Sequence, residues 1–142
     1  MPEALEPATE TETASRKRFS LDEANRALTY VRRVVEDITT QYARIVELRR
    51  AMEGDEEGHP VEHVEAEYET AMDRLGGLVD ELHEAGVELR DFERGIVAFP
   101  ADHDDRVVLF SWQPGEPAVT HFHEQEESIT QRRPVSELDL AA

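Results

Sequence analysis

The sequence predicts an α+β fold, in which a long antiparallel helical hairpin is followed by a small antiparallel sheet of three or four strands. Apolar residues recur at alternating steps of three and four through most of residues 20–86, which is the period of a helix. From residue 87 to residue 124 the period changes to two, which is typical of strands. The connection between the two helical segments is short, and this favours an antiparallel hairpin.

The first predicted helix runs from about Leu21 to about Met52. Ser20 and Glu23 form the S-x-x-E pattern of a capping box, and Phe19 stands before the cap as an apolar residue. No glycine or proline interrupts the segment, and at 1.5 Å per residue it would be roughly 48 Å long. Its heptad seam consists of Ala24, Leu28, Val31, Val35, Ile38, Tyr42 and Ile45.

The second predicted helix lies between Pro60, which suits a first helical turn, and Gly86, which suits a C-terminal stop. Residues 21–50 hold six arginines and five acids, a net charge of +1, whereas residues 53–84 hold one arginine and twelve acids, a net charge of −11. This difference favours pairing of the helices. The apolar seam contributes more, because an exposed ion pair is worth only about 0–1 kcal/mol. The second seam consists of Val61, Val64, Tyr68, Met72, Leu75, Val79 and Leu82.

The sheet is expected to begin directly after the second helix. The segment 106–112 is apolar on both faces, which predicts a central strand. Pro100 is expected to stop the strand before it, and the turn 113–117 leads into the last strand. The expected strands are 87–89, 96–99, 106–112 and 118–124.

The chain is expected to form one folded domain over residues 18–134, with the hairpin at 20–86 and the sheet at 87–124. Residues 1–17 are acidic and poor in large apolar side chains, so we expect a disordered tail. Residues 135–142 form a C-terminal tail. The apolar residues that would let this tail dock back on the fold are Val135, Leu138 and Leu140.

Composition excludes several classes of function. The chain carries 15 Lys+Arg against 33 Asp+Glu, and a net charge of −18 repels a nucleic acid. No apolar run approaches the roughly 20 residues of a membrane span, and the N-terminal segment lacks the features of a signal peptide. There is no cysteine, which excludes disulfides, thiolate metal sites and a cysteine nucleophile. We expect a cytoplasmic protein that binds neither nucleic acid nor membrane.

The densest group of residues with chemical potential is His121, His123 and Glu124. Alternate residues of a strand share a face, so the two imidazoles would lie about 6.6 Å apart and could reach one metal ion. Glu124 would join them if the strand bends there. The sequence leaves the cofactor unknown; the pattern is compatible with a divalent zinc, iron or manganese ion, with these three residues as its ligands. The alternative is an exposed strand face, on which His123 is hydrogen-bonded to a nearby acid.

Three further residues are expected around this site, either lining its pocket or supporting the ligands from behind. They are Trp112, Glu116 and Glu127. The spacing from Gly115 through the two histidines to Glu127 matches the first metal motif of cupin barrels, but the second motif of those proteins is missing. No nucleophile elbow, P-loop or dinucleotide fingerprint occurs, so no catalytic residue is identified and the question of enzyme activity stays open.

Three segments together resemble an uncharacterised prokaryotic family catalogued as domain of unknown function 2203. They are RFSLDEANRALTYVRRVVEDI, GVELRDFERGIVAFP and LFSWQPGEPAVTHFHE. The resemblance covers roughly residues 18–134 and implies the fold and its boundaries, but no reaction, because the family has none assigned. Members typically carry tryptophan where this chain has Phe122, and a histidine at position 121 is not a fixed feature. The site residues that the resemblance favours are His123, Glu124 and Glu116.

Two functions fit these observations. The first is a helical-hairpin interaction or regulatory module, whose seam and acidic second helix form a homodimer or bind a protein partner. The second is a metal-binding protein or metalloenzyme that uses the His-x-His-Glu strand end. We prefer the first function, because it depends on fewer specific features of the sequence.

Overall fold

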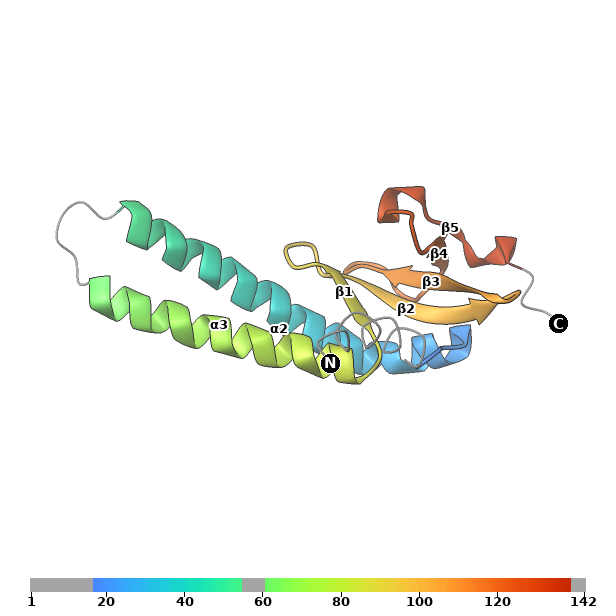
Figure 1. Ribbon diagram of the computed structural model, residues 1–142, viewed down its shortest axis with the longest axis horizontal. Coiled ribbons are helices and arrows are strands. Elements are labelled where there is room, and N and C mark those ends of the chain that lie inside the picture. The colour runs from blue at the N-terminus through green and yellow to red at the C-terminus, as the bar shows by residue number, and fades with distance from the viewer. Residues whose placement is uncertain (1–16, 55–60, 139–142) are drawn as a thin grey trace, which may run out of the picture.

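The structure is a computed structural model that describes residues 17–54 and 61–138 (Figure 1). Helices α2 (Leu21–Gly54) and α3 (Val61–Glu84) precede a five-stranded antiparallel sheet with the order β1-β2-β3-β4-β5. The α+β class is confirmed, with one strand more than the sequence predicts. The strands are β1 (Glu88–Asp91), β2 (Ile96–His103), β3 (Arg106–Trp112), β4 (His121–Glu124) and β5 (Arg133–Pro134).

The start of α2 is fixed by its cap and by the sheet. The Ser20 amide donates to Glu23 Oε1 at 2.9 Å, and the Glu23 amide donates to Ser20 Oγ at 3.0 Å, as a capping box requires. Phe19 is buried, its ring meets the Phe99 ring edge-on at 5.2 Å, and its amide donates to the Pro100 carbonyl at 2.7 Å. The first turn of α2 is therefore tied directly to β2.

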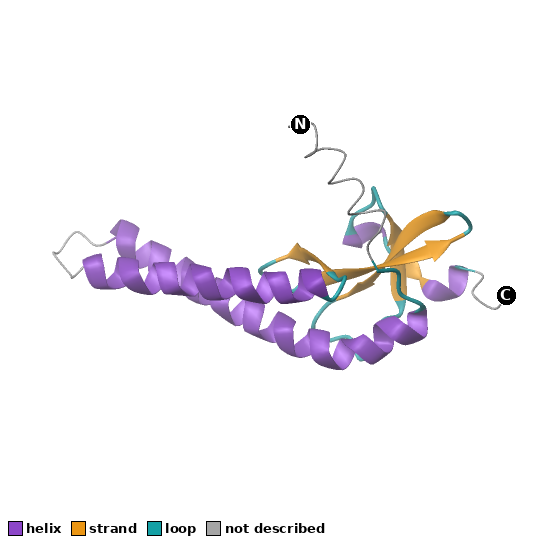
Figure 2. Ribbon diagram, turned by 60° about the horizontal axis from the view of Figure 1, so that its bottom comes forward, coloured by secondary structure: helices purple, strands orange, loops and turns teal. Residues whose placement is uncertain are grey.

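The two helices run side by side as an antiparallel hairpin (Figure 2). The first half of α2 covers one face of the sheet, whereas the far halves of both helices extend beyond the sheet as an arm (Figures 1 and 2). In the arm, the buried contacts run between the helices. They involve Ile45, Leu48, Ala71 and Leu75.

Polar contacts also join the helices. Arg44 Nη2 lies 2.6 Å from Glu67 Oε1, which is an ion pair of the kind that the charge difference predicts. The Tyr30 hydroxyl donates to Glu81 Oε1 at 2.9 Å. These groups are at least partly exposed, so the buried seam supplies most of the hairpin's stability.

The two faces of the sheet belong to different cores. Phe99, Phe110 and Phe122 point towards the helices and join their apolar cluster. Ile96 and Leu109 alternate with such residues and are buried outside that cluster. They lie on the opposite face, over which the chain after β4 passes (Figure 1). Since both faces are covered, β3 is apolar on both, as its sequence indicates.

The prediction that Pro100 stops a strand is wrong. β2 continues to His103, with Pro100 opposite Leu109 of β3. On the other side of β2, the pairing with β1 reaches only as far as Glu88, the first residue of β1, opposite Ala98. No strand therefore requires an amide from position 100 there. On that side the Pro100 carbonyl accepts from the Phe19 amide, and no neighbouring strand pairs with Pro100. A strand tolerates proline at such an open edge.

β4 begins three residues later than the sequence predicts. The Val119 amide donates to Asn25 Oδ1 at 2.8 Å, and the Val119 carbonyl accepts from Asn25 Nδ2 at 3.3 Å. A helix side chain therefore takes the place of a neighbouring strand. The predicted docking of the C-terminal segment occurs at Val135, whose amide donates to the Thr120 carbonyl at 2.9 Å, and at Leu138, which is buried.

Some sequence predictions fall on residues that the structure does not describe: the disordered tail up to residue 16, the helix start at Pro60, and Leu140. Within the described ranges, neither helix has the length of apolar sequence that a membrane crossing requires.

Candidate functional site

Both histidines of the predicted site lie on the sheet face that is turned away from the helices. His121 pairs with Ser111 and His123 with Leu109, while Phe122 between them packs into the helical core. Their environments differ. His123 is only 2% exposed, whereas His121 is half-buried and its Nδ1 lies 2.9 Å from the Thr120 hydroxyl.

Glu116 lies on this face too, but it is engaged by an arginine. Both of its carboxylate oxygens accept from the Arg132 guanidinium, whose Nη1 also donates to Ser111 Oγ at 3.1 Å. The Gln113 amide donates to Glu116 Oε1 at 3.1 Å, and Trp112 Nε1 donates to the Glu116 carbonyl at 2.9 Å. Trp112 and Glu116 thus come together, in a network that holds the turn between β3 and β4.

The charge of Glu116 is stabilised in this network. Burial acts to raise the pKa of its carboxyl group, but the hydrogen bonds from Arg132 and the Gln113 amide act against it, together with the charges of Arg132 and His121. The pKa of Glu116 therefore lies below its usual value, and the carboxylate is ionised near neutral pH.

Glu124 points to the opposite side of β4 from His123. It accepts from Arg106 Nε and Nη2, both at 3.0 Å, and lies 3.5 Å from Arg133 Nη2. The hydrogen bond from Arg106 is the main reason that the pKa of Glu124 lies below its usual value. Glu127 accepts from the Glu124 amide at 3.0 Å and is also 3.5 Å from Arg133.

The carboxylates of the predicted site are engaged by arginines. Glu116, Glu124 and Glu127, the three predicted carboxylates, all face arginines, which repel a cation. Within residues 17–54 and 61–138, no three His, Asp or Glu side chains are grouped as metal ligands are.

His123 instead lines a cavity of about 200 Å³ on the same face of the sheet. Its Nδ1 donates to the Glu124 carbonyl at 2.8 Å, since a carbonyl only accepts, and this leaves Nε2 as the acceptor of the neutral ring. The other walls come from β1, the turn after it, the start of β2 and the chain after β4. They are formed by Arg90, Asp91, Arg94, Ile96, Ser128 and Ile129.

Sequence reasoning misses the residues that share this cavity with His123. Arg90 and Arg94 precede it by about 30 positions, and Ser128 follows β4 in a polar segment without a motif. The sequence signal for this cavity is the pair of arginines at and beside the turn of residues 91–95. This pair does not indicate that His123 lies nearby in the folded sheet.

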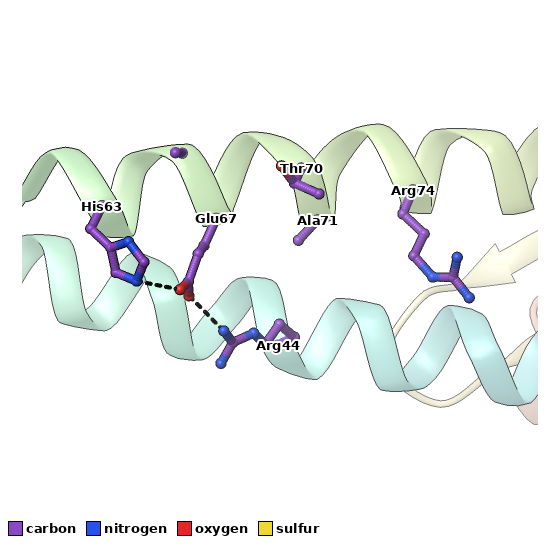
Figure 3. Close-up of a pocket in the computed structure, with 7 residues that line it drawn as sticks. Arg44, His63, Glu67, Thr70, Ala71 and Arg74 are labelled. Atoms are coloured by element: carbon purple, nitrogen blue, oxygen red, sulfur yellow. Dashed lines mark hydrogen bonds and ion pairs between the residues drawn. The ribbon is translucent and has the colours of Figure 1, made fainter.

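A second hollow lies on the hairpin arm, between α2 and α3 (Figure 3). Glu67 projects into it and pairs with Arg44 at 2.6 Å and with His63 Nε2 at 2.7 Å. Its central carboxylate is therefore already satisfied by neighbouring side chains, so we regard it as part of the hairpin's packing.

Comparison with known proteins gives a family and no activity. A family model described as an uncharacterized conserved protein, DUF2203, matches residues 17–135, which include both helices and all five strands. No curated protein matches the chain, and no solved structure does. The match covers far more than half of the 142 residues and agrees with the resemblance of the three sequence segments. The chain therefore belongs to the DUF2203 family of uncharacterised conserved proteins.

Proposed function

We propose that the protein is an interaction module, whose helical arm binds a positively charged surface of a protein partner. The observation that supports this proposal is a row of exposed carboxylates on α3, which we call the acidic stripe. None of them forms an ion pair with a residue in the described ranges 17–54 and 61–138. The acidic stripe consists of Glu65, Glu69, Asp73, Asp80 and Glu84.

The acidic stripe points away from α2. At 100° per residue its five members fall within an arc of about 100° on the helix. The side chains that α3 buries lie on the opposite side of the helix. They are Ala71, Leu75, Leu78 and Leu82. The stripe thus lies on the outer side of α3, and Glu65 and Glu69 lie on the half of this helix that the sheet does not cover (Figure 1).

The stripe has an energetic cost that a cationic partner would relieve. Glu65, Glu69 and Asp73 follow one another at intervals of four residues, as do Asp80 and Glu84. Like charges at this spacing destabilise a helix by about 0.2–0.5 kcal/mol per pair. A partner that places Lys or Arg against the row converts this repulsion into attraction and is steered towards it from a distance.

A second copy of the chain fits the stripe less well than a basic partner does. Each copy has a net charge of −18, so two copies repel each other at long range. Met72, which is 43% exposed beside the stripe, offers an apolar contact to a partner of either kind. The homodimer predicted from the heptad pattern is therefore the alternative outcome of the test below.

The proposal is tested by site-specific photo-crosslinking in the host cytosolic extract. The crosslinking residue replaces Asp73 in the acidic stripe, and in the control it replaces Asp37, an exposed carboxylate on α2. We expect a protein adduct from position 73 that position 37 does not give. An adduct of twice the chain's mass would instead identify a second copy, and absence of any adduct would refute the proposal.

The captured protein is then purified and its affinity measured with the stripe neutralised. The combined variant Glu69→Gln, Asp73→Asn and Asp80→Asn is expected to weaken binding at least tenfold, and wild-type binding should weaken as salt rises. The matched control neutralises the same number of exposed acids on α2. It combines Glu36→Gln, Asp37→Asn and Glu47→Gln. Equal affinity of the two combined variants would contradict the role of the stripe.

The metal-binding alternative and the cytoplasmic location stay predictions from the sequence. Elemental analysis of the untagged protein beside His123→Ala tests the first of these. Zinc, iron or manganese bound in near-stoichiometric amount and lost in the variant would support it.

A further inference from the structure

We propose that the cavity beside His123 is a binding site for a phosphate group, either inorganic phosphate or the terminal phosphate of a small ester. The site lies on the far side of the sheet from α2 and shares no residue with the acidic stripe. It is argued from three properties of the cavity: its positive side chains, the buried imidazole and its size.

Two of the chain's 15 basic residues line this one small cavity, although acids outnumber basic residues by more than two to one. Arg90 Nη1 lies 3.1 Å from Glu88 Oε1. The guanidinium of Arg94 makes no ion pair or hydrogen bond with the described part of the chain, since only its backbone amide is engaged, by Asp91 Oδ1 at 2.8 Å. A guanidinium presents several N–H donors in a planar fork that matches the oxygens of a phosphate.

His123 supplies a second, independent observation. Its ring is almost fully buried, yet its hydrogen bond in the described structure uses Nδ1 alone. No fully buried side-chain nitrogen or oxygen of the described residues lacks a partner, so Nε2 retains contact with solvent, and the ring borders the cavity. A polar ring held in this way presents one nitrogen to a ligand.

The imidazole favours phosphate over other anions. A neutral Nε2 accepts a hydrogen bond from P–OH, and a protonated Nε2 donates to P–O⁻, so a phosphate group satisfies either form. Sulfate and carboxylate near neutral pH carry no hydrogen to donate, and they match only the protonated ring. Ser128, whose hydroxyl lies 2.7 Å from Thr130 Oγ1, adds a further hydroxyl at the wall.

The cavity limits the size and charge of the ligand. A cavity of about 200 Å³ has room for a phosphate group. Asp91 also lines the cavity, so the two arginines must offset its repulsion of an anion, and a ligand with a second negative group would be repelled more strongly. We therefore expect one phosphate group in the cavity.

Binding is measured by calorimetry and by amide NMR on the full chain, with inorganic phosphate, glycerol phosphate and sulfate as probes. We expect saturable phosphate binding, with shifts at His123 and Arg94, and at least fivefold weaker binding of sulfate. A tighter complex with glycerol phosphate identifies an ester as the ligand, and a tighter complex with inorganic phosphate identifies the free ion.

The variants separate binding from folding. His123→Asn can keep the hydrogen bond to the Glu124 carbonyl while it removes the nitrogen at the cavity, whereas His123→Gln places an amide near that nitrogen. We expect Arg94→Gln and His123→Asn to weaken phosphate binding at least tenfold and His123→Gln to retain part of it. Arg33→Gln, on the exposed surface of α2, is the control.

Absence of saturable binding overturns the proposal. So does equal binding of phosphate and sulfate, or wild-type affinity in both Arg94→Gln and His123→Asn. Urea midpoints within error of wild type are required of each variant. A variant that fails this requirement is replaced by Arg94→Met or by His123→Leu, which likewise remove the guanidinium or the imidazole, in the same comparison.

Discussion

Replacing Arg132 by methionine is expected to lower the free energy of unfolding by about 3 kcal/mol. The Arg132 and Glu116 side chains are 16% and 20% exposed, so solvent screens their pair only partly. Removing one partner of a fully buried pair costs about 3–5 kcal/mol, and partial exposure reduces this to about 2 kcal/mol. Ser111 Oγ, fully buried, also loses a donor, which costs about 1 kcal/mol more.

Urea unfolding followed by circular dichroism measures this loss. With an m-value of about 2 kcal/mol/M, the midpoint should fall by about 1.5 M. The double variant Arg132→Met with Glu116→Gln removes the unpaired charge and should recover about 1–2 kcal/mol, which appears as coupling between the two positions. Arg106→Met is the matched control. It removes an arginine that also holds a glutamate by two bonds, Glu124, at side-chain exposures of 46% and 27%.

Burial is the reason that we expect the two arginines to differ. An exposed pair gains little Coulomb energy in water and loses side-chain entropy, so Arg106→Met should cost clearly less than Arg132→Met. Equal losses in the two variants, or a double variant as unstable as the sum of its singles, would refute the reasoning.

Three further changes test the local structure. Ser20→Ala removes the capping hydrogen bond and should cost about 1 kcal/mol in urea unfolding, and an unchanged midpoint would mean that Phe19 alone fixes the helix start. Gly95→Ala should cost about 1–3 kcal/mol, because φ is +75° and the new Cβ would lie 2.7 Å from Val35 Cγ1; wild-type stability would contradict this contact. The pKa values of Glu116 and Glu124 lie below the usual 4.5, so the unfolded chain binds more protons, and stability present at neutral pH should be lost as the pH falls below about 4.5. Urea midpoints between pH 7 and pH 3 should show this loss, and Glu116→Gln should make the profile flatter.

The helices could be predicted because their signals are local. The capping box, the steps of three and four and the absence of glycine or proline in residues 21–52 all lie within the segment that they specify. The same holds for β3, where a continuous apolar run indicates a strand buried on both faces.

The differences in the sheet come from partners that are distant in sequence. Pro100 is tolerated in β2 because the pairing with β1 does not extend past Ala98. β4 begins late because Asn25, 94 positions before Val119, occupies the backbone groups of Val119. β5 has only two residues, Arg133 and Pro134, and they pair with β4 because the whole C-terminal segment lies against it. No local pattern records these contacts.

In the candidate site, too, local features could be predicted and contacts between distant residues could not. Alternation within one strand was enough to predict that His121 and His123 share a face. The sequence contains the carboxylates around them but not the arginines that each of them meets, because Arg106 and Arg132 reach these positions only through strand pairing and the turn after β4. In the structure the carboxylates of this motif are paired with arginines, and the His123 imidazole is buried apart from them.

The Arg132 network links the stability of the fold to the proposed phosphate site. Arg132 does not line the cavity, but it holds the segment that carries Ser128 and Ile129 against the sheet through its bonds to Ser111 and Glu116. If this segment forms a wall of the site, Arg132→Met should weaken phosphate binding under conditions in which the variant is still folded. Neutralising the acidic stripe should leave that binding unchanged, because no residue of α3 lines the cavity and much of α3 extends beyond the sheet (Figure 1). A loss of phosphate affinity in the stripe variant would mean that the two faces are coupled and that the arm and the cavity serve one function.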